Sequence, residues 1–298
     1  MGDEVYADAP PPSGGLIRLR TQASDLGSWL GPLWAMLCGV LASKAFSWQG
    51  GEDWVRLALL ALLLDAGWGT LWAALASTDW AGPVQRWHEW HKNRALARLP
   101  YTMPGTPGDR ISHWMGRAEA WWREALWPIC GSAVQAAVAA LPLIALLGML
   151  LGPEILLLSG AALALMQLGV IWTSGRDDVP AGWDGLIGIA LPWLAGHAAF
   201  GLVSLPSASL AVLFALAWGS AWNVPSRGAR TAAVVSQLSS AGCLIALHRP
   251  LAAGVMLLLL MPQAALLPWI RRHLPTVRFV RHTRPWLLAA MAVAALAL

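Results

Sequence analysis

The sequence LWPICGSAVQAAVAALPLIALLG fills residues 126–148 and contains no charged side chain. A helix rises about 1.5 Å per residue, so a segment of this length extends roughly 35 Å. The hydrocarbon core of a bilayer is about 30 Å thick, and a long uncharged run of this kind is typical of a transmembrane helix. The stretch therefore predicts a membrane-spanning helix near the middle of the chain.

The composition of the whole chain agrees with this prediction. The 298 residues are 57% hydrophobic and 12% charged, whereas about 25% of the residues in an ordinary soluble domain are charged. Mean hydropathy is +0.55. These values exclude a soluble enzyme, a disordered chain and a fibrous repeat, and they indicate an integral membrane protein. Cys38, Cys130 and Cys243 stand in apolar runs, so we interpret them as core residues and expect no disulfide.

Runs of this kind recur along the chain, separated by proline and glycine. We expect an all-α polytopic membrane protein with nine spans, at residues 27–47, 54–78, 126–148, 155–173, 185–205, 208–222, 231–248, 251–270 and 286–298. The last run is short, so it crosses only in part or its helix begins before Pro285; eight spans is the alternative. Residues 1–26 predict an extended cytoplasmic tail without a signal peptide, followed by a single transmembrane domain at 27–298.

Basic residues gather on one side of these spans. With the N-terminus inside, 17 of the 20 Lys and Arg residues fall in inner segments, and only Lys44, Arg56 and Arg249 fall outside. The positive-inside rule then predicts a cytoplasmic N-terminus in an inner membrane. The longest cytoplasmic connection, residues 79–125, is predicted to form a cap, with a helix at 86–98 lying along the membrane interface.

Three short motifs resemble one family of membrane enzymes. Residues 29–39 read WLGPLWAMLCG, residues 191–196 read LPWLAG, and residues 101–112 end in GDRIS. These motifs and the order of spans and loops resemble the UbiA superfamily of intramembrane prenyltransferases, and within it chlorophyll or bacteriochlorophyll synthase. The resemblance implies nine helices in a UbiA-like arrangement, with cytoplasmic loops that bind a prenyl diphosphate through Mg²⁺.

The carboxylates that such an enzyme needs are mostly replaced. The family's first cluster, N-D-x-x-D-x-x-x-D, falls on Asp79, Gly82 and Arg86, so only its first aspartate is retained. The second cluster falls on residues 223–228, which hold no carboxylate. Mg²⁺ prefers several hard oxygen ligands, and arginine supplies none. We therefore favour a degenerate synthase without the chemistry and without a metal site.

An active enzyme is the alternative. It would combine the remnant Asp79 with Asp177, Asp178 and Asp184, which lie in the connection after the fourth span, and it would need Mg²⁺. The interpretation that we favour for these three aspartates is a solvated turn, with Asp184 near a helix N-terminus, because a negative charge is unsuited to contacting phosphate.

Four residues within the spans are candidates for binding a ligand. His197 follows the LPWLAG motif; it either binds the Mg of a chlorophyll-type ring or is a core histidine bonded to a backbone carbonyl or to Gln167. Asp65 lies midway along the second span, where it faces a substrate cavity or a structural partner. Trp34 and Trp193 lie deep in their spans, where they line a cavity for a macrocycle or polyisoprenoid, or pack against neighbouring helices. Other tryptophans lie near span ends, as an aromatic belt requires.

The expected function is that of a non-catalytic, synthase-like membrane subunit or assembly factor. It would associate with other membrane subunits, such as a photosynthetic reaction centre or antenna, and bind bacteriochlorophyll, carotenoid, quinone or lipid. The photosynthetic context comes from the resemblance alone. The lipid bilayer is a partner and nucleic acid is not, because the basic residues of 271–284 form a short juxtamembrane loop suited to anionic headgroups. An active prenyltransferase is the second hypothesis, and a lipid or quinone transporter has only the spans in its favour.

Overall fold

The computed structural model describes residues 26–80, 82–84, 87, 105–173, 181–222, 227–270 and 276–298. Within these ranges the ordered elements are all helical and no strand is present. The prediction of an all-α fold is therefore confirmed for the part of the chain that the structure describes.

Apart from the helical residues 82–84 and 87, the described helices form nine segments, three of which contain a π-helical stretch (η). The elements are α1 (Leu26–Ser43), α2 (Gly51–Leu62), η2 (Leu63–Gly69), α3 (Thr70–Ala76), α5 (Pro107–Trp121), η3 (Trp122–Leu126), α6 (Trp127–Leu151), α7 (Pro153–Thr173), α8 (Ala181–Gly185), η4 (Leu186–Ala190), α9 (Leu191–Phe200), α10 (Leu205–Trp222), α11 (Arg227–Ala246), α12 (Pro250–Ile270) and α13 (Thr276–Ala297). The runs α2–η2–α3, α5–η3–α6 and α8–η4–α9 are each continuous.

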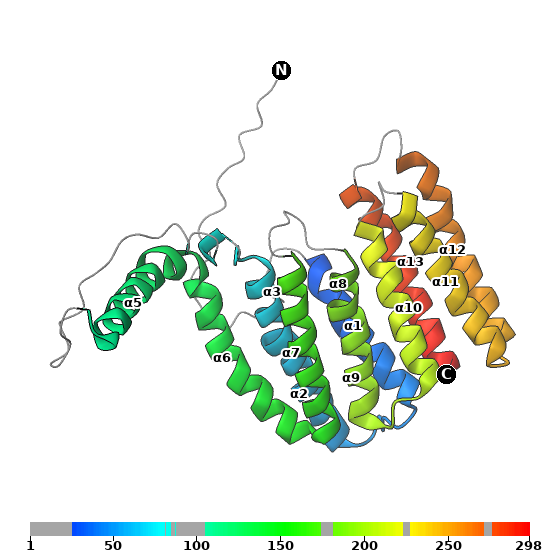
Figure 1. Ribbon diagram of the computed structural model, residues 1–298. Coiled ribbons are helices and arrows are strands. Elements are labelled where there is room, and N and C mark those ends of the chain that lie inside the picture. Colours follow the sequence, from blue (N-terminus) through cyan, green and yellow to red (C-terminus); the bar gives the residue numbers. More distant parts are fainter. Residues whose placement is uncertain are drawn as a thin grey trace.

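The long helices run alternately up and down, with their connections at two levels (Figure 1). We call the level at which α3 ends and α6 begins the upper face, and the level at which α6 ends and α7 begins the lower face. α5 does not follow this pattern, because it turns aside from α6 at the upper face and lies beside the bundle (Figure 1).

Two of the π-helical stretches stand directly before a proline. Pro128 follows η3 and Pro192 follows η4. A proline inside a helix has no N–H to donate and its ring collides with the carbonyl four residues earlier. A π-helical turn moves that carbonyl and lets the helix continue with a bend, which is a recognised cause of helix kinks. The sequence thus explains how α6 and α9 remain joined to the helices before them.

The core is divided into two hydrophobic clusters that meet along α1 and α9. One cluster includes Trp193 together with buried residues of α10–α13, such as Phe214 and Met291. The other includes Met36 and Trp68 with buried residues of α6 and α7. α1 and the η4–α9 run contribute to both clusters, so this pair of helices joins the two halves of the bundle.

Among the described residues, three helices are long and apolar enough to cross a membrane: Gly51–Ala76, Pro107–Leu151 and Pro153–Trp172. The final helix begins at Thr276 and contains Pro285, which confirms the expectation that it starts before that proline. The helix predicted from residue 126 begins earlier, at Pro107, inside the expected cap connection. Apart from Trp87, the cap helix expected at 86–98 lies outside the described residues.

Candidate functional site

Gly39 ends the WLGPLWAMLCG motif and Gly196 ends the LPWLAG motif, and the two glycines face each other where α1 crosses α9. A Cβ added to Gly39 would overlap the backbone carbonyl oxygen of Trp193, and one added to Gly196 would overlap that of Met36. Glycine alone lets two helix backbones approach so closely, as at the small-residue crossings of membrane helices. Both motifs therefore have a packing role at the centre of the bundle.

A chain of hydrogen bonds lies beside this crossing. The Trp193 indole Nε1 donates to the Ser207 Oγ at 3.0 Å, and that oxygen lies 2.9 Å from the His197 Nδ1. The His197 Nε2 lies 3.0 Å from the carbonyl oxygen of Leu202. A carbonyl can only accept, so Nε2 carries the proton and the Ser207 hydroxyl donates to Nδ1. Trp193, His197 and Ser207 are all buried.

These contacts bear on the prediction that His197 binds a pigment. Both ring nitrogens are already engaged within the chain, so coordination of a ring metal would require one of these bonds to break. The geometry fits the alternative of a core histidine bonded to a backbone carbonyl, with Leu202 rather than Gln167 as the partner. A pigment-binding role for His197 stays a prediction.

Trp34 lines a lateral groove between α1 and α2. The groove has a volume of about 340 Å³ and its walls are apolar: Leu33, Trp34, Met36, Leu37, Trp54, Leu57, Ala58 and Ala61. The Trp34 Nε1 donates to the carbonyl oxygen of Leu288 at 2.9 Å, so α13 fixes the ring. A groove with these walls can hold a hydrocarbon chain, because it offers contact area and no hydrogen-bonding group.

The predicted carboxylates do not gather into one cluster. Asp79 is exposed, and its Oδ1 accepts from the backbone N–H of Gly82 at 3.0 Å, which closes the turn after α3. The Asp184 Oδ1 accepts from the Trp72 indole at 3.1 Å and joins α8 to α3. Asp65 is half-buried in η2.

The carboxylates that the structure describes do not by themselves form a site for Mg²⁺. Asp177 and Asp178 lie outside the described residues. Among the residues that are described, no group of three or more His, Cys, Asp or Glu side chains is placed to hold a metal ion. Mg²⁺ with a diphosphate requires converging oxygen ligands, and Asp79 and Asp184 each use an oxygen in a structural bond.

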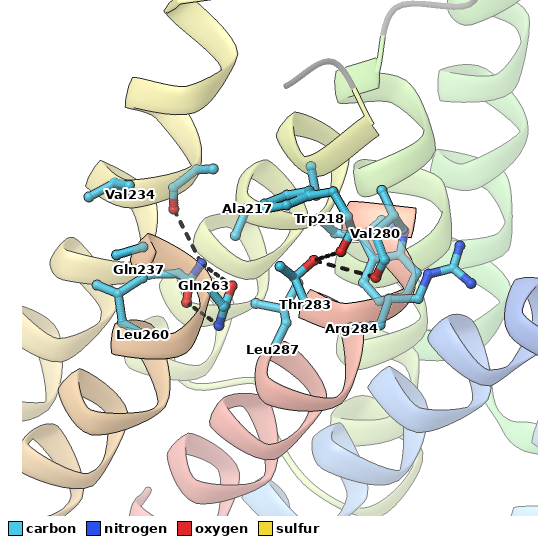
Figure 2. A pocket seen from close by; sticks show the side chains of 14 residues that line it. Ala217, Trp218, Val234, Gln237, Leu260, Gln263, Val280, Thr283, Arg284 and Leu287 are labelled. Carbon is cyan, nitrogen blue, oxygen red and sulfur yellow. Dashed lines mark hydrogen bonds between the residues drawn. The ribbon is translucent and has the colours of Figure 1, made fainter. Parts of the chain in front are cut away.

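A second pocket, between α10, α11, α12 and α13, was missed from the sequence (Figure 2). On one side Gln237 and Gln263 form a reciprocal amide pair, with N···O distances of 3.0 and 3.1 Å. On the other side Thr283 donates to the carbonyl of Phe279, and the Arg284 guanidinium lies 5.3 Å from the ring centre of Trp218. The signal available in the sequence was a glutamine in each of two apolar spans, which membrane helices rarely tolerate without a partner.

The two amides of this pocket are largely satisfied by one another and by their own helices. The second N–H of Gln237 donates to the carbonyl of Ala233, and that of Gln263 donates to the carbonyl of Leu259. The pair therefore links α11 to α12 by hydrogen bonds. The open side of the pocket is mainly apolar.

No family model matches the chain, and neither the curated proteins nor the solved structures compared with it include a significant match.

Proposed function

We propose that the chain is a polytopic protein of an inner or photosynthetic membrane, with nine crossings and a cytoplasmic upper face. Aromatic side chains at both levels of the bundle support this placement. Trp172, in the last turn of α7, lies toward the upper face and is 64% exposed; Trp48 and Trp54, just before and at the start of α2, lie toward the lower face and are 67% and 47% exposed. Tryptophan is enriched at the two surfaces of a bilayer.

Within that membrane, the proposed function is that of a non-catalytic subunit or assembly factor with a UbiA-like, chlorophyll-synthase-like arrangement. The observation that carries this proposal is the use of the remaining carboxylates: Asp79 closes a turn and Asp184 ties α8 to Trp72. Side chains that hold the fold together in this way are poorly placed to hold a magnesium-bridged diphosphate as well.

The groove at Trp34 is the proposed place for a ligand. Its apolar walls suit the chain of a carotenoid, a quinone or a lipid, and the isoprenoid tail of a bacteriochlorophyll. Its open side would face the membrane, where a neighbouring subunit of a pigment–protein complex could also contact the ligand.

A direct test is purification of the tagged chain from its native membrane, followed by absorption spectroscopy and analysis of co-purified subunits. The proposal expects retained pigment or quinone and a photosynthetic partner. Ala58→Phe, which fills the groove, should reduce the retained ligand. Val138→Phe, at a position of α6 that is 67% exposed, is the matched control and should retain it.

The second candidate is an active prenyltransferase, favoured by the location of Asp79 and Asp184 after α3 and within α8, helices that the Trp72–Asp184 bond joins. It predicts Mg²⁺-dependent transfer from geranylgeranyl diphosphate to a macrocycle acceptor, and loss of that transfer in Asp79→Ala. Such turnover, from a protein that purifies as a pigment-free monomer, would overturn the non-catalytic proposal.

A further inference from the structure

α5 and the first residue of η3 carry an apolar stripe that no other described element covers. Ile111, Trp114, Met115 and Trp122 are 58%, 61%, 49% and 44% exposed. Their spacing is i, i+3, i+4 and i+11, which places them along one side of a helix with 3.6 residues per turn. Exposed side chains of this size in a continuous row mark a contact surface rather than scattered surface residues.

The opposite side of α5 faces the protein. Gly116 and Ala120, about half a turn away from the stripe, are buried. The stripe therefore points away from the other elements that the structure describes.

Two hydrogen bonds to the backbone of residues 83 and 87 fix the rotation of α5 about its axis. The Arg117 Nη2 donates to the carbonyl of Trp87 at 2.8 Å, and its guanidinium lies 4.8 Å from the centre of the Trp87 ring. The Trp121 indole donates to the carbonyl of Pro83 at 3.0 Å. Rotation of α5 about its axis to bury the stripe against the protein would break both hydrogen bonds.

The stripe is continuous with the surface of the helix that enters the membrane. α5 passes through η3 into α6 without a break, and the rings of Trp122 and Trp127 lie 6.2 Å apart. α6 belongs to a helix apolar enough to cross a membrane, and α5 turns aside at its upper end (Figure 1). The stripe thus begins at the level where α6 would meet the bilayer surface.

The charges of α5 are arranged to balance one another. Arg123 pairs with Glu119 at 2.8 Å, and His113 lies 3.5 Å from Asp109. Arg110, Arg117 and Arg123 are matched by Asp109, Glu119 and Glu124 across residues 107–124. Electrostatic attraction to anionic lipid is therefore weak, and the exposed apolar row supplies the driving force for contact with a membrane.

We propose that α5 is an in-plane membrane anchor whose stripe lies at the boundary between headgroups and acyl chains, in the leaflet that α6 enters. The proposal rests on the membrane crossing of α6 proposed above. Because the contact is apolar, its depth should not change with salt or with the fraction of anionic lipid.

Spin-label accessibility in vesicles tests the proposal. Single cysteines are placed, in a background lacking the three native ones, at 111, 114 and 115 on the stripe, at 110 beside it, at 113 on the other side of the helix, and at 138 on α6. The protein is reconstituted in phosphatidylcholine, with or without phosphatidylglycerol. Collisions with oxygen, which concentrates in lipid, should exceed collisions with a water-soluble nickel chelate at the stripe. The ratio should be reversed at 110 and 113, at low and high salt alike.

Each other outcome has a definite meaning. Greater access of the nickel chelate at the stripe would place α5 in water, and low access of both reagents would place it against protein; either result overturns the anchor. A label at 138 that oxygen does not reach would instead refute the membrane placement of α6. Trp114→Asp should shift the label at 111 from oxygen toward nickel, and His113→Asp, about half a turn away from the stripe, should leave it unchanged.

Discussion

The crossing of α1 and α9 offers the sharpest test of the structure. In Gly196→Ala, the new Cβ would overlap the carbonyl oxygen of Met36 and lie 3.1 Å from the backbone nitrogen of Val40. Both atoms belong to the backbone, so no side-chain rotation relieves the overlap and the two helices must separate. The replacement of Gly160, in α7, by alanine is the matched control, because a Cβ there meets no atom within 4 Å.

The expected size of the effect follows from two opposing terms. Alanine is favoured over glycine in a helix by up to about 1 kcal/mol, and this gain applies at both positions. Overpacking a tight interior costs about 1–3 kcal/mol, and this cost applies only at Gly196. Because the gain is common to both variants, they should differ in unfolding free energy by the overpacking cost alone, roughly 1–3 kcal/mol, with Gly160→Ala at or above the wild type.

Unfolding can be followed by the reaction of buried thiols with a fluorogenic maleimide during heating in detergent. Cys38 and Cys130 are 1% and 0% exposed, so their reaction reports the opening of the bundle. At about 2 °C per kcal/mol, the midpoints of Gly196→Ala and Gly160→Ala should differ by roughly 2–6 °C at one scan rate. Equal midpoints would refute the close crossing, and with it the packing explanation of the motif.

Two further predictions concern buried polar groups. Ser207→Ala removes the hydroxyl between His197 and its neighbouring indole and should cost about 1–3 kcal/mol; Ser240→Ala, whose hydroxyl bonds only within its own helix, should cost less in the same thermal assay. Gln237→Leu and Gln263→Leu each leave the other amide without its hydrogen-bond partner across the two helices. A double-mutant cycle should therefore give a favourable coupling energy of about 0.6 kcal/mol, at most about 2 kcal/mol. Strictly additive effects would contradict the amide pair.

The sequence predicted the helical class and the approximate places of the helices, because long apolar runs between prolines have few alternatives. It could not predict that Pro128 lies inside one helix running from Pro107 to Leu151, since a proline after a charged segment usually marks a helix start. The π-helical stretch before Pro128 lets the helix continue, and no residue pattern signals it.

The candidate site was harder to predict for a different reason. The partners of His197 are Ser207, across a turn, and the carbonyl of Leu202, and a backbone carbonyl is not readable as a ligand from sequence. Gln237 and Gln263 are separated by 26 positions, and their pairing depends on how α11 and α12 are rotated about their axes. Apolar periodicity determines such rotation poorly in helices that are hydrophobic on all sides.

Packing and chemistry make separate demands on this fold. The crossing of α1 and α9 requires Gly39 and Gly196 whatever reaction takes place, because any larger residue would meet a backbone carbonyl. The carboxylates after α3 and within α8 have no such constraint from the crossing, and Asp79 and Asp184 make contacts unrelated to it. Under the proposed synthase-like function, the two glycine-ended motifs could be retained for packing while the carboxylates differ from those of an active enzyme. This separation is why the carboxylates, rather than the matching motifs, bear on whether the chain is an enzyme.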